Sequence, residues 1–79
     1  SLSFWRDSAG HEVDLLRREA GRTKAYEIKS GATFSKSYFT GLDYWGRLSN
    51  TGPEDRAVIY GGDRSMRTSS GEVKAWEEM

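Results

Sequence analysis

The amino-acid sequence predicts an α/β domain that has a small, mixed five-stranded sheet and one helix across a face of it. Apolar and polar residues alternate in short runs through the first 29 positions, which is typical of half-buried strands. The period becomes helical between residues 35 and 49, and a short continuous apolar run follows at residues 57–60. A chain of 79 residues is enough for one such domain.

Three short strands are expected first, at residues 2–6, 11–17 and 24–29. The turns between them contain glycine, so the strands should form an antiparallel meander. Side chains alternate between the two faces of a strand. In a regular second strand, one face therefore receives Val13 and Leu15, and the other receives Glu12, Asp14 and Leu16.

A single helix is expected from Ser35, a typical N-cap residue, to about Ser49. Its apolar side chains recur at helical spacing and form one stripe that faces the core. The stripe consists of Tyr38, Leu42, Trp45 and Leu48, and is widened by Phe39. Gly41 and Gly46 lie inside this helix, where each costs about 1 kcal/mol of helix propensity. We expect them there because the helix packs closely against a neighbour.

Two further strands complete the predicted sheet. The apolar run at residues 57–60 is typical of a strand covered on both faces. The helix before it supplies the crossover that a parallel pair needs, so this strand should lie parallel to the third. Residues 73–76 are predicted to form a short antiparallel strand at the edge of the sheet.

Composition restricts the function classes. The chain has 12 basic and 12 acidic residues, whereas a non-specific nucleic-acid binder usually has a basic excess. It has no cysteine, which excludes a disulfide framework and a thiolate zinc site. No apolar run reaches the roughly 18 residues of a membrane span. One basic cluster, expected at a hairpin tip, would contact a nucleic-acid backbone or only aid solubility: Arg17, Arg18, Arg22 and Lys24.

Asp14 and Glu27 are predicted to lie almost opposite each other, because the turn between the second and third strands is centred near residue 20 or 21. Opposed side chains have Cβ atoms about 4.5–5.5 Å apart. Two carboxylates this close repel each other unless a cation lies between them, and a hard ion such as Mg²⁺ suits such ligands. Lys29 shares the face of Glu27, where it would act on an attacking water or stabilise negative charge.

Other interpretations of these charged residues stay open. Asp14, Glu27 and Lys29 also fit a structural cluster of salt bridges. For His11, the one histidine, a surface or hydrogen-bonding role is favoured over that of a metal ligand. Glu12 is either an accessory ligand or, as we favour, a solvated strand charge. The Gly61-Gly62-Asp63 segment (residues 61–63) is expected to be a turn rather than a phosphate site.

The arrangement resembles the signature of the PD-(D/E)XK nuclease-like superfamily, in which a lone Asp is followed on the next strand by Glu-X-Lys. Here the matching residues are Asp14 and then Glu27, Ile28 and Lys29. Three stretches, FWRDSAGHEVDLL, YEIKSGATFS and VIYGGD, are similar to one branch. That branch is the uncharacterised C-terminal domain family that follows AAA-type ATPase modules in bacteria and archaea.

The resemblance implies a mixed sheet in the order 1-2-3-4-5 and metal-dependent hydrolysis of DNA phosphodiesters. It implies Asp14 and Glu27 as Mg²⁺ ligands, with the backbone carbonyl of Ile28 as a third. Lys29 would be the catalytic base or charge stabiliser. The alternative function is a non-catalytic accessory domain that docks protein or nucleic acid for an attached ATPase.

The resemblance also implies a restriction-endonuclease-like core that lacks its first helix. Residues 1–79 would then be a single domain and a C-terminal fragment of a larger cytoplasmic ATPase. ATP would bind upstream, since no G-x-x-x-x-G-K occurs here. Expected partners are DNA and the ATPase module. Without the first helix one sheet face lacks a cover, so we expect the isolated chain to form homo-oligomers.

Overall fold

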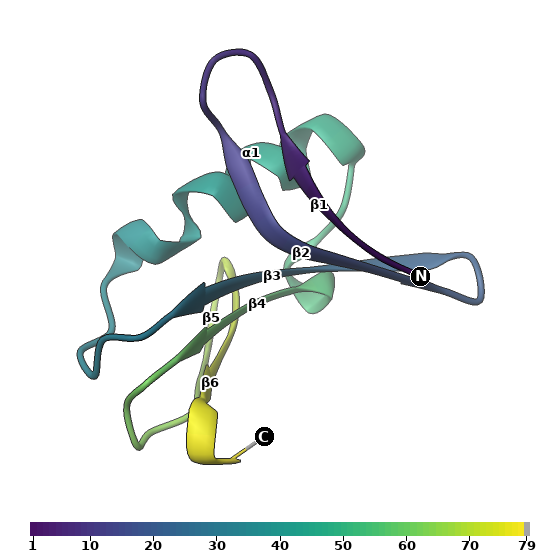
Figure 1. Cartoon of the computed structure of the whole chain (residues 1–79). Helices are drawn as coiled ribbons and strands as arrows, with labels where there is room; N and C mark the ends of the chain where they lie inside the picture. The colour runs from purple at the N-terminus through teal and green to yellow at the C-terminus, as the bar shows by residue number, and fades with distance from the viewer. Residues whose placement is uncertain (79) are drawn as a thin grey trace.

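The structure is a computed structural model that describes residues 1–78, and it consists of one sheet with a helical segment on one side (Figure 1). Within these residues the sheet has six strands in the order β1-β2-β3-β4-β6-β5. The strands are β1 Leu2–Arg6, β2 Glu12–Glu19, β3 Arg22–Lys29, β4 Arg56–Tyr60, β5 Met66–Thr68 and β6 Gly71–Ala75. The helices are η1 Lys36–Phe39, α1 Thr40–Ser49, η2 Pro53–Asp55 and η3 Trp76–Glu78.

The sheet combines an antiparallel half with a parallel half. β1, β2 and β3 form the predicted antiparallel meander, and β4 lies parallel to β3 as predicted. The prediction of an antiparallel edge strand at residues 73–76 was wrong. β6 is parallel to β4 and lies inside the sheet, while β5 forms the edge and pairs with β6 in antiparallel fashion. The sheet therefore has six strands and not five.

The position of β6 follows from a hairpin that the sequence pattern does not reveal. β5 has only three residues, and none of them is buried. The Thr68 hydroxyl accepts hydrogen bonds from the amides of Ser70 and Gly71, at 3.1 and 3.2 Å, and so closes the turn. The chain returns between β4 and β5, which leaves Val73 and Ala75 fully buried. An edge strand would have left one side of this backbone unpaired.

β2 contains a bulge that changes which of its residues share a face. Ser3 pairs with Leu16 and Trp5 pairs with Val13, so two steps along β1 match three steps along β2. Such a bulge bends the strand and shifts the alternation of its side chains. Val13 and Leu16 are therefore both buried, and the prediction that Val13 shares a face with Leu15 was wrong. The outer half of the β1–β2 hairpin curls beside α1 (Figure 1).

The predicted helix at residues 35–49 consists of two parts, η1 and α1. The Ser35 hydroxyl accepts a hydrogen bond from the Ser37 amide at 3.3 Å, which confirms Ser35 as a cap. Asn50, with a φ of 56°, ends α1 in the left-handed conformation. Leu48 was predicted to lie in the core, yet it is 63% exposed. It lies six residues after Leu42, which is about 120° away around the helix.

The hydrophobic core lies between α1 and one face of the sheet. Gly41 and Gly46 permit this close packing, as predicted. A Cβ atom on Gly41 would overlap the carbonyl oxygen of Glu12, and one on Gly46 would overlap the Arg56 guanidinium. The buried residues of this core are Val13, Leu16, Ala25, Phe39, Leu42, Trp45, Val58, Tyr60, Val73 and Ala75.

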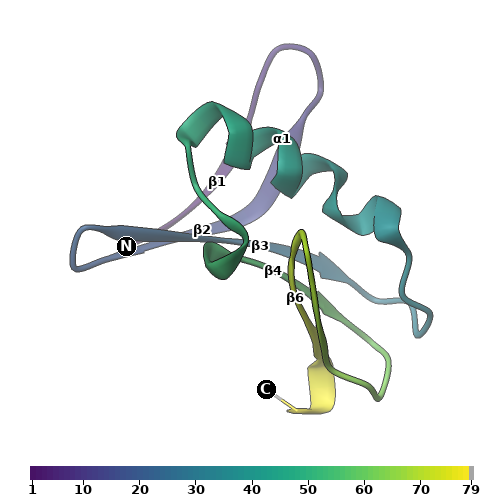
Figure 2. The same ribbon diagram turned by 180° about the vertical axis from the view of Figure 1, so that it is seen from behind.

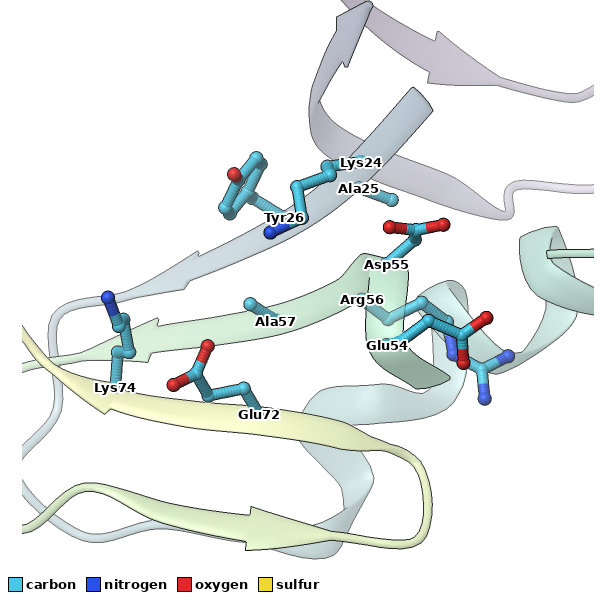
Figure 3. Close-up of a pocket in the computed structure, with 9 residues that line it drawn as sticks. All are labelled: Lys24, Ala25, Tyr26, Glu54, Asp55, Arg56, Ala57, Glu72 and Lys74. Atoms are coloured by element: carbon cyan, nitrogen blue, oxygen red, sulfur yellow. The ribbon is translucent and has the colours of Figure 1, made fainter. Parts of the chain in front are cut away.

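The opposite sheet face, which we call the open face, has no helix across it (Figure 2). The register gives this face Leu2 and Phe4 of β1, Leu15 of β2, Tyr26 and Ile28 of β3, Ala57 and Ile59 of β4, and Glu72 and Lys74 of β6. Phe4 is 71% exposed, whereas Ile59 in the central strand is buried. A small hollow of about 70 Å³ lies on this face. Figure 3 shows one of its lining residues, Ala57, between charged side chains of β3 and β6.

Candidate functional site

Glu27 and Lys29 lie on the α1 side of β3, near the end of the strand. Glu27 is the one buried charged residue of the described chain, and only 9% of it is exposed. Its Oε2 atom is 3.1 Å from Nζ of Lys29. The predicted pairing of these two side chains on one face is confirmed, because they are two residues apart in a regular strand.

Asp14 lies at the bulge of β2, directly before the residue that pairs with β3. Leu15 is opposite Tyr26, where the pairing of β2 with β3 begins, so Asp14 lies one residue outside the paired register. The direct opposition of Asp14 and Glu27 stays a prediction. The exposed Asp14 side chain turns toward β3, and its Oδ2 accepts a hydrogen bond from the Ile28 amide at 2.9 Å. The carboxylate thus takes the place of a backbone acceptor at this end of the β2–β3 pairing.

The Ile28 carbonyl faces the same side as the Ile28 amide. In an extended strand the N–H and C=O of one residue face the same neighbouring strand. Because the amide donates to Asp14, the carbonyl of Ile28 also points toward β2. The Asp14 carboxylate and the Ile28 carbonyl therefore both face the space between β2 and β3. The Asp14 carboxylate is also close enough to Glu27 to affect its pKa.

The environment of Glu27 makes ionisation of its carboxyl group less favourable than in water. Burial raises the pKa of Glu27 above the ordinary value of 4.5, and the hydrogen bond with Lys29 opposes that rise. The nearby Asp14 carboxylate raises this pKa further by charge repulsion. A buried carboxylate beside a second carboxylate is the electrostatic condition that a bound cation would relieve.

A hollow of about 240 Å³, which we call the acidic hollow, opens beside Glu27 on the α1 side. It lies between β2, β3 and the start of the helical segment, and its lining includes Glu27, Lys29, Tyr38 and Thr40. Nζ of Lys29 is 5.4 Å from the centroid of the Tyr38 ring, within the range of a cation–π contact. Sequence reasoning assigned Tyr38 to the core only. Helical periodicity contains no signal for its contact with Lys29.

His11 and Glu12 have partners of their own. Nδ1 of His11 is 2.9 Å from Oδ2 of Asp7, and its ring stacks on Tyr44 with centroids 3.6 Å apart. The favoured hydrogen-bonding role of His11 is therefore confirmed, although His11 precedes β2 rather than lying in it. Glu12 pairs with Arg6 at 3.1 Å, and both side chains are at least half exposed, as a solvated strand charge would be.

Two residues of the basic cluster, and the segment after β4, have partners within the fold. In the basic cluster, Arg17 pairs with Glu19 and Arg22 with Asp55, both at 2.8 Å. Gly61 begins a bend after β4, and its amide donates to the Gly31 carbonyl at 3.0 Å. This bond joins the loops at the ends of β3 and β4. The turn predicted at residues 61–63 is confirmed.

Within residues 1–78, no group of three or more His, Cys, Asp or Glu side chains is arranged to hold a metal ion. The acidic site thus consists of two side chains, Asp14 and Glu27. In the same part of the chain, no helix has the length and apolar character needed to cross a membrane.

Comparison with known proteins gives one result that covers almost the whole chain. Neither the curated proteins nor the solved structures contain a match. The family described as domain of unknown function DUF4143 matches residues 1–78. The chain belongs to this uncharacterised family, DUF4143.

Proposed function

We propose that this domain is nuclease-like and hydrolyses DNA phosphodiester bonds with the aid of a divalent metal ion. The observation that carries the proposal is the buried Glu27, which pairs with Lys29 at 3.1 Å while the Asp14 carboxylate approaches from the next strand. This agrees with the resemblance to the PD-(D/E)XK signature.

The donor atoms at the bulge fit a magnesium ion. Mg²⁺ usually binds through one or two carboxylates and keeps several waters or substrate phosphate oxygens. Asp14 and Glu27 would supply the carboxylates, and the Ile28 carbonyl a further oxygen. The raised pKa of Glu27 supports this assignment, because a cation would favour the ionised form that burial disfavours. When bound, such an ion would supply Lewis acidity toward a phosphate oxygen.

Lys29 would then act on the reacting atoms rather than on the metal. An ammonium group has three donors and no acceptor, so it is not a ligand. Its contacts with Glu27 and the Tyr38 ring hold it at the rim of the acidic hollow. From there it would stabilise negative charge on the phosphate, or in its neutral form accept a proton from the attacking water.

Calorimetric titration with Mn²⁺ or Mg²⁺ tests the site. We expect binding that is lost in Asp14→Asn and kept in Glu19→Gln, a matched carboxylate-to-amide change at the far end of β2. We expect Lys29→Ala to keep metal binding and to lose cleavage of a DNA substrate. Absence of metal binding in the unmodified chain would contradict the proposal. Loss of folding in Lys29→Ala would instead indicate a structural salt bridge.

The open face supports a second candidate, a non-catalytic domain that docks a partner for an attached ATPase. Leu2, Phe4 and Ile28 of this face are 44–71% exposed, and large exposed apolar patches on a folded domain usually mark an interaction surface. In this case the Glu27–Lys29 pair is only structural. Absence of metal binding, together with a normal fold, would favour this candidate.

A further inference from the structure

A further hollow lies at the end of the sheet and is distinct from the acidic hollow. Its volume is about 480 Å³, and it is lined by Ile28, Lys29, Ser30, Gly61 and Trp76. We call it the Trp76 hollow. Ligand sites in proteins typically have volumes of about 300–1,000 Å³.

The position of the Trp76 hollow in the fold is one that α/β proteins use for ligands. β3, β4 and β6 are mutually parallel, and they end at Lys29, Tyr60 and Ala75. The hollow lies just beyond these carboxyl ends, between the loop after β3, the loop after β4 and the start of η3. In open α/β sheets, ligands bind outside the carboxyl ends of the strands.

Trp76 gives the hollow an aromatic surface against which no other aromatic ring of the described chain packs. The residue is 59% exposed. Ile28 adds apolar surface and is 44% exposed. An exposed indole ring offers a large, planar apolar surface to which another ring can stack.

Two lysines lie near this aromatic surface, one on each face of the sheet: the ammonium of Lys29 is on the α1 side, 3.1 Å from Oε2 of Glu27, and Lys74 is on the open face. Lys29 lines both the Trp76 hollow and the acidic hollow, and it is the one residue that they share. Lys74 lies on the open face in register with Ile59, which is itself in register with Ile28. Lys74 has no ion pair within the described chain, and Figure 3 shows it on β6 near the open face of β4. A planar ring that carries an anionic group complements these features.

We propose that the Trp76 hollow binds an unpaired base of a single-stranded nucleic acid, with the base stacked on Trp76 and its phosphate near Lys29. The ligand class rests on the proposed nuclease function, which this inference makes more specific. Single-strand binding sites combine a cationic path for the backbone with aromatic rings for the bases. A base inside a duplex is stacked on its neighbours and cannot present its face to Trp76.

The two hollows together define a path for the strand. Because Lys29 belongs to both, a phosphate at the Glu27–Lys29 pair would have its neighbouring nucleotide at the Trp76 hollow. Stacking there would hold the strand in register with the acidic site. The domain would therefore prefer single strands, or frayed ends of duplexes, over intact duplex DNA.

Fluorescence anisotropy with a labelled oligothymidine octamer in EDTA tests the inference without metal or cleavage. Loss of one base–aromatic stack corresponds to about a 5- to 150-fold loss of affinity. We expect a loss in this range for Trp76→Ala, and a much smaller loss for Trp76→Phe, which keeps a ring. The matched control is Phe4→Ala, which removes another exposed ring of the open face and should bind like the unmodified chain.

An octamer of abasic sugar phosphates separates stacking from charge. The unmodified protein should bind this octamer more weakly than oligothymidine, and Trp76→Ala should cause no further loss. Equal affinities of Trp76→Ala and the unmodified chain for oligothymidine would overturn the inference. So would equal losses in Trp76→Ala and Phe4→Ala, or light scattering that shows a dimer whose formation depends on Trp76.

The outcome is separable from that of the proposed nuclease function. EDTA removes the metal ion, so octamer binding is measured without any contribution from metal bound at the acidic site. Binding that depends on Trp76, without cleavage under any metal condition, would uphold the base site and contradict the nuclease. Cleavage with Mg²⁺ by a protein whose binding ignores Trp76 would do the reverse.

Discussion

The two faces of the sheet differ in what their side chains do. The α1 face buries a continuous apolar core, and the one buried carboxylate of the described chain, Glu27, lies within that layer. The open face has a buried centre at Ala57 and Ile59, with exposed rings toward its ends. The α1 face thus provides the stabilising core and holds the buried Glu27 carboxyl group. The open face provides exposed apolar surface for contact with a partner. A small domain can separate the two tasks because strand side chains alternate.

Truncation on the two faces should produce the largest contrast. Leu42 is fully buried, so Leu42→Ala should lower the free energy of unfolding by about 2–5 kcal/mol. Phe4→Ala on the open face should change it by about 0.5 kcal/mol or less, since the ring is already in water. Urea unfolding measures both. Similar losses in the two variants would show that the open face is covered in solution.

The closeness of α1 to the sheet can be tested at Gly41. Gly41→Ala adds a Cβ atom that would overlap the Glu12 carbonyl oxygen, which belongs to the backbone and cannot rotate away. We expect a loss of about 1–3 kcal/mol from overpacking, reduced by about 1 kcal/mol of gained helix propensity. Gly46→Ala should cost less, because its nearest obstacle is the flexible Arg56 side chain. Stabilisation by Gly41→Ala would contradict the packing described for α1.

The buried Glu27 on the α1 face should make the free energy of unfolding depend on pH. Burial raises the pKa of Glu27 in the folded protein, so the folded state binds this proton more tightly than the unfolded chain. The resulting stabilisation is complete below the unfolded pKa and is lost as pH rises through the folded pKa. Metal-free unfolding measured upward from pH 4.5 should show this decline. Glu27→Gln should flatten it, whereas Glu12→Gln, at an exposed carboxylate, should not.

The smallest expected effect is self-association through the open face. We expect the isolated chain to form weak dimers at high micromolar concentration, because exposed apolar faces favour association. Phe4→Lys should weaken these dimers and leave the fold intact. Size-exclusion chromatography with light scattering provides the measurement. A monomer of 8.9 kDa at every concentration would show that the open face is stable in contact with water.

The elements that depend on short-range sequence patterns could be predicted from the sequence alone. The meander, the cap at Ser35, the parallel β4 and the pairing of Glu27 with Lys29 follow from alternation, capping chemistry and crossover geometry. The bulge in β2 was not predictable, because an extra residue in a strand leaves the apolar composition unchanged. β5 was missed because it has only three residues, Met-Arg-Thr, and so short a segment shows no alternation of polar and apolar side chains. The Lys29–Tyr38 contact depends on how η1 packs, which is a tertiary property.

The division of the sheet into antiparallel and parallel halves has a consequence for folding kinetics. The turns at residues 7–11 and 20–21 join β1, β2 and β3, so these strands meet after short loop closures. β4 reaches β3 only after residues 30–55 have folded back over the sheet, which is a longer and slower search. We expect pulsed hydrogen exchange to protect the β2–β3 amides before those of β4 and β6. Asp14 and Glu27 would then come together early, and the Trp76 hollow, which needs β4 and η3, would form last.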